Sequence, residues 1–340
     1  MRRLFAPAIC VWRLPLFSSL LPSVFLFVCS SAHSADPIPD RLVVLTFDDS
    51  ALSHYTVAAP LLRDYGFGAT FFITEGFDFR TNKKDYMTWE QIAELHRMGF
   101  EIGNHTRDHV GINDAAVPRL SEQLDGINEQ CRKHGIPQPV TFAWPANATS
   151  EKAFAGLRQK GIVFARRGGA PEYPYDKGRG FAYEPGRDHS LLVPSAGDAR
   201  PDWTMQDFIR AVSQAKDGRV AVLQFHGVPD TAHSWVNSPQ QQFQAYMKYL
   251  SLNDYTVIAL RDLRKYVSIK DDPADPQAII RERQAAVRKN VMPDGAVPET
   301  TAPGRAERNK AAVKAKSKKD GRTIGRTIGR STRAFNRTLA

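Results

Sequence analysis

Short apolar segments alternate with segments of helical periodicity along this chain, and the alternation constrains the fold more than any other feature. Eight apolar segments lie at 41–47, 69–74, 100–104, 140–145, 162–166, 189–196, 219–225 and 255–260. Helical patterns lie between several of them, at 57–66, 88–99, 119–135 and 203–218. Strands that are apolar throughout are buried on both faces, as in a parallel sheet covered by helices. Roughly seven such repeats predict an α/β protein with a distorted (β/α) barrel of about seven parallel strands.

The chain divides into four predicted segments. Residues 1–35 combine early arginines, an apolar run and small residues near the end, which is typical of a secretory signal peptide. A retained membrane anchor is the alternative. We predict the barrel over 36–270, a charged C-terminal helix over 271–292, and a disordered basic tail over 293–340, where like charges accumulate. We therefore expect a protein that is secreted or located in the periplasm or cell envelope.

The excess of positive charge lies at the two ends of the chain. The formal net charge is +10, but residues 305–340 carry twelve Lys and Arg against two acidic residues. The leader adds +3, which leaves −3 for residues 36–304. On an exported protein, a basic tail suits an anionic cell-envelope polymer better than nucleic acid, so we expect no nucleic-acid partner, and a monomer. Cys131 is the only cysteine beyond the leader, so no intramolecular disulfide can form in the exported chain.

Two adjacent carboxylates, Asp48 and Asp49, follow the apolar segment 41–47. Neighbouring carboxylates disfavour each other's ionisation unless a positive charge lies beside them. Asp-Asp-Ser is also ordinary turn chemistry, and the segment alone leaves that alternative open. In a (β/α) barrel, however, functional residues gather where the strands end.

Three histidines also follow predicted strands. His105 and His109 come after segment 100–104, and their spacing of four places both rings on one face if a helical turn follows the strand. Neutral imidazoles are common zinc ligands, and two His with one carboxylate leave a coordination position for water, as catalytic sites require. His226 follows segment 219–225 and is either a buried core residue or a general acid.

Three motifs in this arrangement resemble those of the polysaccharide deacetylases, the NodB-homology carbohydrate esterases. They are TFDDS at 46–50, HTRDH at 105–109 and QFHG at 224–227, and their order and spacing are similar to the family's. The resemblance extends over about residues 40–267. It implies a distorted barrel of the NodB-homology type, which removes N- or O-acetyl groups from sugar polymers with a divalent metal.

The resemblance also implies a role for each motif residue. Asp48 would be the general base and His226 the general acid, while Asp49, His105 and His109 would bind the metal. Zinc is the expected ion, with cobalt and nickel as alternatives, because two imidazoles and a carboxylate suit all three. Asp48 would take a proton from the metal-activated water, and His226 would donate one to the leaving group.

The chain departs from the family in its third motif. The family's arginine beside the general base is missing, because the segment here reads FAWPAN and places Ala143 at that position, followed by Trp144 and Pro145. We hypothesise that Arg166 or Arg167, at the end of the next strand, replaces it. Trp144, Pro145 and Arg166 are accordingly predicted at the substrate site.

Two further departures concern the substrate pocket. Trp203 lies in DARPDW, a segment one residue longer than the usual fourth motif, and is predicted at the acetyl pocket; the alternative is a core tryptophan at a helix start. Gln224 stands where the family has a leucine, so an ordinary methyl pocket is not expected. Trp235 lies in the loop after His226 and is predicted to contact the substrate.

These observations favour an exported metal-dependent hydrolase that removes acetyl groups from an acetylated glycan. One alternative from the same chemistry is a hydrolase of other non-peptide C–N amide bonds or of esters. Another, from a different class, is a catalytically weak or inactive barrel that binds carbohydrate. The departures in the third and fifth motifs favour this second alternative, whereas the five intact motif residues oppose it.

Overall fold

The computed structural model describes residues 35–291, and its strands follow the apolar segments of the sequence. β1 is apolar apart from one threonine and is buried along its whole length. The remaining strands are shorter, and β8 is also buried along its whole length. The strands are β1 (Leu42–Phe47), β2 (Thr70–Ile73), β3 (Glu101–Asn104), β4 (Thr141–Ala143), β5 (Phe164–Gly168), β6 (Val193–Pro194), β7 (Gly197–Asp198), β8 (Ala221–Phe225) and β9 (Thr256–Ile258).

The strands form one curled parallel sheet with the order β6-β5-β4-β3-β2-β1-β8-β7. Its two outer strands, β6 and β7, are halves of a single segment, residues 193–198. The first half pairs with β5 and the second with β8. Between them, the amide of Ser195 donates to the carbonyl of Gly168 (3.0 Å) and that of Ala196 to Val222 (2.7 Å). This segment therefore connects the two ends of the sheet, and the predicted fold class, a distorted parallel barrel, is confirmed.

The strand predicted at 189–196 is shorter than expected because its first half forms a 3-10 turn, Ser190–Leu192. The ring of His189 accepts a hydrogen bond from the amide of Leu191 (3.0 Å). The carboxylate of Asp272 accepts from the amide and the hydroxyl of Ser190, both at 2.7 Å. These local side-chain hydrogen bonds compete with strand pairing, and apolar composition does not reveal them.

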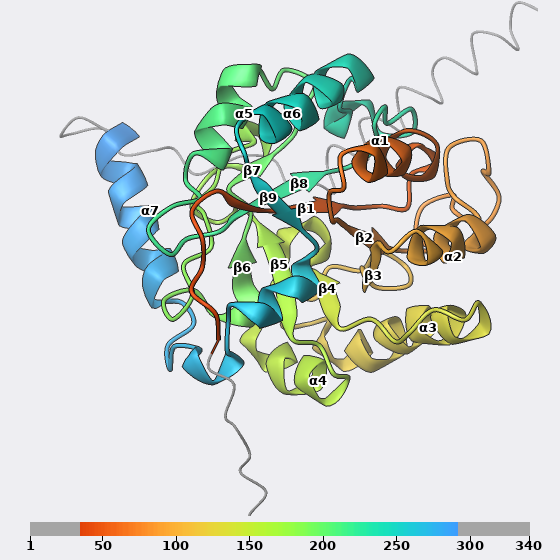
Figure 1. Ribbon diagram of the computed structural model, residues 1–340. Coiled ribbons are helices and arrows are strands. Elements are labelled where there is room, and N and C mark those ends of the chain that lie inside the picture. The colour runs from red at the N-terminus through yellow and green to blue at the C-terminus, as the bar shows by residue number, and fades with distance from the viewer. Residues whose placement is uncertain (1–34, 292–340) are drawn as a thin grey trace, which may run out of the picture.

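Helices surround the strands in Figure 1, with α7 on the side away from α2 and α3. Capping boxes start α2 and α5, where Thr88 and Gln91, and Thr204 and Asp207, exchange hydrogen bonds as their spacing predicts. The helices are α1 (Ala59–Asp64), α2 (Trp89–Arg97), α3 (Leu120–Lys133), α4 (Phe154–Gln159), α5 (Met205–Val212), α6 (Gln240–Leu252) and α7 (Ala278–Val291).

Apolar packing and one buried ion pair fix the helices to the barrel. Phe243 of α6 packs edge-on against Phe47 of β1 (5.8 Å between ring centroids) and against Phe225 of β8 (5.3 Å). On the opposite side, Arg283 of α7 donates to both carboxylate oxygens of Asp188 at 2.8 and 2.9 Å. Such a pair fixes geometry more than it adds stability, because both charges lose water.

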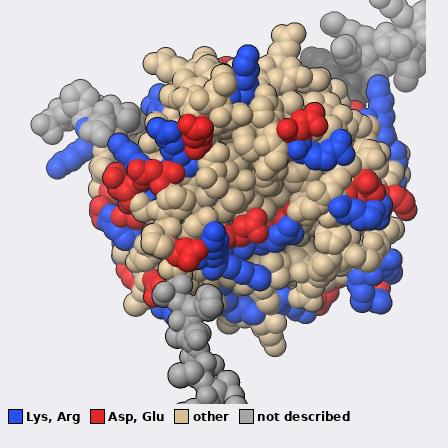
Figure 2. Space-filling view, in the orientation of Figure 1, with Lys and Arg blue, Asp and Glu red and all other residues tan. Residues whose placement is uncertain are grey.

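Several sequence predictions concern the ends of the chain. The predicted leader and basic tail lie outside the described residues, so the division into segments stays a prediction. Between residues 35 and 291, no helix combines the length and the apolar character that crossing a bilayer requires. On the face in Figure 2, Lys and Arg side chains of the described part are interspersed with Asp and Glu. Cys131 is buried in α3, and burial raises the pKa of its thiol to about 12.

Candidate active site

Asp48 and Asp49 lie directly beyond β1, at the barrel edge where β3 and β8 also end. The amide of Asp48 donates to the carbonyl of Phe225 (3.0 Å) and extends the pairing of β1 with β8. Asp49 and Ser50 then adopt left-handed backbone angles, with φ of 73° and 59°. The hydroxyl of Ser50 holds this turn by donating to the carbonyl of Thr74 (2.8 Å) and accepting from its amide (2.9 Å). Such conformations are costly for residues other than glycine and tend to occur at functional sites.

The side chains of Asp49, His105 and His109 converge at this edge. The Oδ1 atom of Asp49 lies 3.4 Å from Nε2 of His105 and 3.2 Å from Nε2 of His109. Their ligand atoms all lie within 4.8 Å of one another. The chain between the histidines is not the predicted helical turn, because Thr106 and His109 have φ of 58° and 53°. A loop, fixed by the 3.0 Å hydrogen bond from the Thr106 amide to Oδ1 of Asn104, brings the rings together instead.

These three residues fit a divalent metal such as zinc. The carbonyl of Ala143 can only accept, so Nδ1 of His105 donates to it (2.8 Å), which leaves Nε2, on the side of Asp49, as the atom that would bind the ion. Burial by itself would raise the pKa of Asp49. The imidazoles of His109 and His105 outweigh that effect and hold the pKa well below its usual value. Two imidazoles and an ionised carboxylate form a zinc-type donor set that leaves one position open.

Asp48 is held by a separate buried polar cluster. Its Oδ2 accepts hydrogen bonds from Nη2 of Arg166 and from Nε2 of Gln224 (3.2 Å). Nη1 of Arg166 in turn donates to Oε1 of Gln224 (2.7 Å). The other carboxylate oxygen, Oδ1, has no hydrogen-bond partner among residues 35–291. The cluster therefore supplies a positive charge beside Asp48 while leaving one oxygen available for a proton.

Strand register explains how Arg166 replaces the missing arginine. Ala143 on β4 pairs directly with Arg166 on β5, so a long side chain from the partner strand reaches the position that residue 143 cannot fill. Arg166 is fully buried, and it is therefore a positioning residue for Asp48 rather than the predicted substrate contact. Arg167 is not the replacement, because its guanidinium pairs with Glu172 at 2.5 and 2.7 Å.

His226 faces the same centre from β8. Its Nε2 lies 3.9 Å from Oδ2 of Asp49, and its Nδ1 lies 3.8 Å from Oδ1 of Asp198. The other oxygen of Asp198 accepts a hydrogen bond from Arg200. Nε2 of His54, in the π-helix His54–Ala58, donates to the carbonyl of His226 (3.1 Å). The sequence analysis assigns no role to Asp198, the last residue of β7 beside β8. Its only signal in the sequence is its position two residues after the apolar segment 189–196.

Two predicted substrate residues lie in the core instead. Trp144 is 1% exposed, and its Nε1 donates to the carbonyl of Leu191 (2.9 Å). Trp203 is 3% exposed, and its Nε1 donates to the carbonyl of Gly178 (3.1 Å). A tryptophan is readily buried once its N–H finds an acceptor, and the sequence does not show whether one is available. Pro145 is also buried, at the start of the turn Pro145–Asn147.

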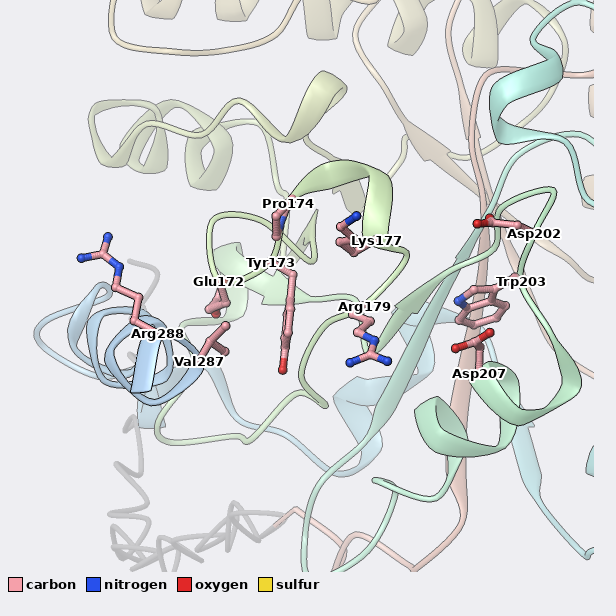
Figure 3. Close-up of a pocket in the computed structure, with 10 residues that line it drawn as sticks. All are labelled: Glu172, Tyr173, Pro174, Lys177, Arg179, Asp202, Trp203, Asp207, Val287 and Arg288. Atoms are coloured by element: carbon pink, nitrogen blue, oxygen red, sulfur yellow. The ribbon is translucent and has the colours of Figure 1, made fainter. Parts of the chain in front are cut away.

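Trp203 lines a cavity of about 580 Å³, whose lining residues are shown in Figure 3. The cavity is bounded by the loop at 172–179, the start of α5 and the end of α7, and the residues converging near Asp49 do not line it. Trp235, in contrast, is 60% exposed, as a substrate contact requires.

The fold and the site define a class of protein: a parallel (β/α) barrel with a potential metal centre between the buried Asp48 and the buried His226. Comparison with known proteins shows which family the chain resembles. Residues 35–165 match the family described as polysaccharide deacetylase. The resemblance read from the motifs is thereby confirmed over the segment that contains Asp48, Asp49, His105 and His109.

The similar curated proteins are bacterial. A putative polysaccharide deacetylase of Bacillus subtilis, YxkH, is 35% identical over 122 residues, or 36% of this chain and 43% of the relative. A peptidoglycan-N-acetylglucosamine deacetylase of Bacillus cereus is 28% identical over 127 residues, which is 37% of this chain and 55% of that protein. The chain thus spans about half the length of these relatives.

Two of the solved structures that match the chain are described as family 4 esterases. PdaA of Bacillus subtilis is 18% identical with a TM-score of 0.46, and the match covers 68% of this chain and 84% of that one. An acetyl xylan esterase from Clostridium thermocellum, solved in complex with a cobalt ion, is 22% identical with a TM-score of 0.46. That match covers 70% of this chain and 95% of the esterase.

Proposed function

We propose that this protein is an exported, metal-dependent hydrolase that removes acetyl groups from an acetylated polysaccharide. One observation carries the proposal. Asp48, held by Arg166, and His226, whose Nδ1 lies 3.8 Å from Asp198, lie beside the three candidate ligands of the metal site. A base and an acid next to one metal centre are what hydrolysis of an amide or ester requires. The polysaccharide deacetylase family of residues 35–165 supports the acetyl group as the target.

The chain's own residues divide the work of such a reaction. Asp49, His105 and His109 would hold a divalent ion, which when bound polarises the acyl oxygen and makes water a better nucleophile. Asp48 accepts the proton of the attacking water through Oδ1, while Arg166 and Gln224 hold its Oδ2. His226 then donates a proton to the departing nitrogen or oxygen as the bond to the acetyl carbon breaks.

The same site bears on the two alternatives. A carbohydrate-binding protein without activity does not need a cation beside Asp48, yet the buried Arg166 supplies one from a neighbouring strand. Hydrolysis of another non-peptide C–N amide uses the same base and acid, so the acyl donor must be decided by substrate tests. Zinc is the proposed ion, with cobalt or nickel as alternatives.

The remaining proposals concern the whole protein. We infer export through residues 1–35, an anionic cell-envelope polymer as the partner of the basic tail, and a monomer in solution. The mixed charges on the face in Figure 2 are consistent with a tail that acts separately from the barrel. Sedimentation of the purified chain and its location in fractionated cells test the monomer and the export.

Acetate release from acetylated glucosamine oligomers, peptidoglycan and acetylated xylan tests the function. We expect release from at least one of them with zinc or cobalt present. Asp48→Asn should retain the metal but lose at least about 10²-fold in turnover, because a positioned base contributes about 10² to 10⁴. Equal turnover in Asp48→Asn would contradict the proposed base. Bound metal without acetate from any substrate would contradict the proposed substrate class.

A further inference from the structure

A row of aromatic rings runs from the candidate metal site to the protein surface. Neighbouring ring centroids lie 4.9 Å apart for His105 and His109, 4.5 Å for His109 and Phe77, 4.6 Å for Phe77 and His233, and 5.2 Å for His233 and Trp235. Phe77 is 44% exposed and Trp235 is 60% exposed. Phe77 thus contacts His109 of the site directly, and Trp235 is linked to Phe77 through the ring of His233.

The backbone holds Phe77 in this place at a conformational cost. Its φ of 57° lies in the left-handed region, which a bulky side chain rarely adopts. The preceding Gly76 packs on the loop of His109, where a Cβ at residue 76 would lie 2.7 Å from the Cβ of His109. The amide of Glu75 donates to the carbonyl of Arg107 (2.7 Å) and joins the same two loops. The structure therefore fixes the exposed ring of Phe77 against His109 despite the strain, as is common at ligand sites.

Trp235 is anchored through the histidine beside it. His233 is largely buried; its amide donates to Oδ1 of Asp230 (2.6 Å), and its Nε2 lies 3.2 Å from the hydroxyl of Tyr86. The other oxygen of Asp230 accepts from the amide of Gly227, the residue that follows the proposed acid (3.1 Å). The loop that presents Trp235 is therefore tied to the end of β8, and its ring stands on a rigid support.

We propose that Phe77 and Trp235 are stacking platforms for neighbouring sugar units of one glycan chain. This inference rests on the proposed function and assigns the side of the site along which the chain extends. Rigid aromatic rings pack well against the apolar faces of pyranose rings and lose little conformational freedom in doing so. The ring of His233 lies between the two platforms, 4.6 Å from Phe77 and 5.2 Å from Trp235. The distance between the platforms cannot exceed the sum of these two values, so adjacent sugars can reach both.

Trp235 provides a direct readout of binding without catalysis. The other tryptophans of the described residues, at positions 89, 144 and 203, are at most 9% exposed. We expect a tetramer of N-acetylglucosamine or an acetylated xylotetraose, added to the metal-free full-length protein, to shift and quench tryptophan emission. The change should disappear in Trp235→Phe. If neither tetramer changes the emission of the wild type or binds in calorimetry, the proposal is wrong.

Affinity measurements separate the platforms from the reaction centre. Trp235→Ala and Phe77→Asn, which accepts a left-handed backbone, should each weaken tetramer binding about tenfold, the loss of one stacking contact. The monosaccharide, which cannot span both platforms, should lose less affinity than the tetramer in each variant. Leu252→Ala, an exposed apolar residue at the end of α6, is the matched control and should change nothing. Unchanged tetramer affinity in both variants, or a wild-type dimer that Trp235→Ala dissociates, would overturn the proposal. Absence of hydrolysis alone would count against the proposed function and not against the platforms.

Discussion

Replacing Arg166 with methionine tests the most unusual feature of the site. The side chains of Arg166 and Asp48 are 0% and 3% exposed, so the substitution leaves an ionised carboxylate buried without its cation. Removing one partner of such a pair costs about 3–5 kcal/mol of unfolding free energy. Because Asp48 also loses the hydrogen bond that orients it, we expect acetate release to fall at least about 10²-fold. Urea unfolding and acetate release on the same preparations measure the two effects.

A double-mutant cycle distinguishes a specific pair from general damage. Removing both charges in Asp48→Asn/Arg166→Met should cost less stability than the sum of the two single changes, because no unpaired charge stays buried. Arg167→Met is the matched control: an equally buried arginine of the same strand that pairs with Glu172, whose loss should reduce stability but not turnover. Additive stability losses, or equal turnover losses in Arg166→Met and Arg167→Met, would refute the reasoning.

Two further predictions concern residues around His226. Asp198→Asn removes the carboxylate 3.8 Å from Nδ1 of His226 and should reduce turnover by about tenfold or more without loss of metal, as metal analysis and kinetics can check. Burial lowers the pKa of His54 to about 4, so between pH 6.5 and 4 the unfolded chain binds a proton that the native chain does not, and stability falls as the pH falls. His54→Gln should therefore remove about 2 kcal/mol of the stability lost between pH 7 and pH 5 in urea unfolding, and an unchanged loss would contradict this.

The sequence predicts the parts of the site that follow from strand ends. Asp49 and His105 come within two residues of the end of an apolar segment, with His109 four residues further on, and parallel strands place such residues at one edge of the barrel. Their convergence therefore needs only the strand order. The left-handed loop that replaces the predicted helical turn at 105–109 depends on hydrogen bonds such as that from Thr106 to Asn104, which spacing does not encode.

Other features depend on contacts between distant segments. The choice of Arg166 over Arg167 follows from the register of β4 with β5, and a slip of one residue would exchange the faces of the two side chains. Gln224 stands where the family has a leucine, and its side-chain amide explains the change. The amide accepts from Arg166 and donates to Asp48, so it bridges the two residues. Trp144 is in the core because a carbonyl of a distant segment accepts from its ring, and composition carries no trace of that partner.

Metal content of the purified full-length protein tests the central claim most directly. Elemental analysis and titration with zinc should give one divalent ion per wild-type chain and none in Asp49→Ala, because that substitution removes the one carboxylate of the three converging ligands. His54→Gln, a buried histidine outside the ligand set, should keep its ion. A wild-type chain that binds no divalent ion, or an Asp49→Ala variant that binds it equally well, would contradict the account.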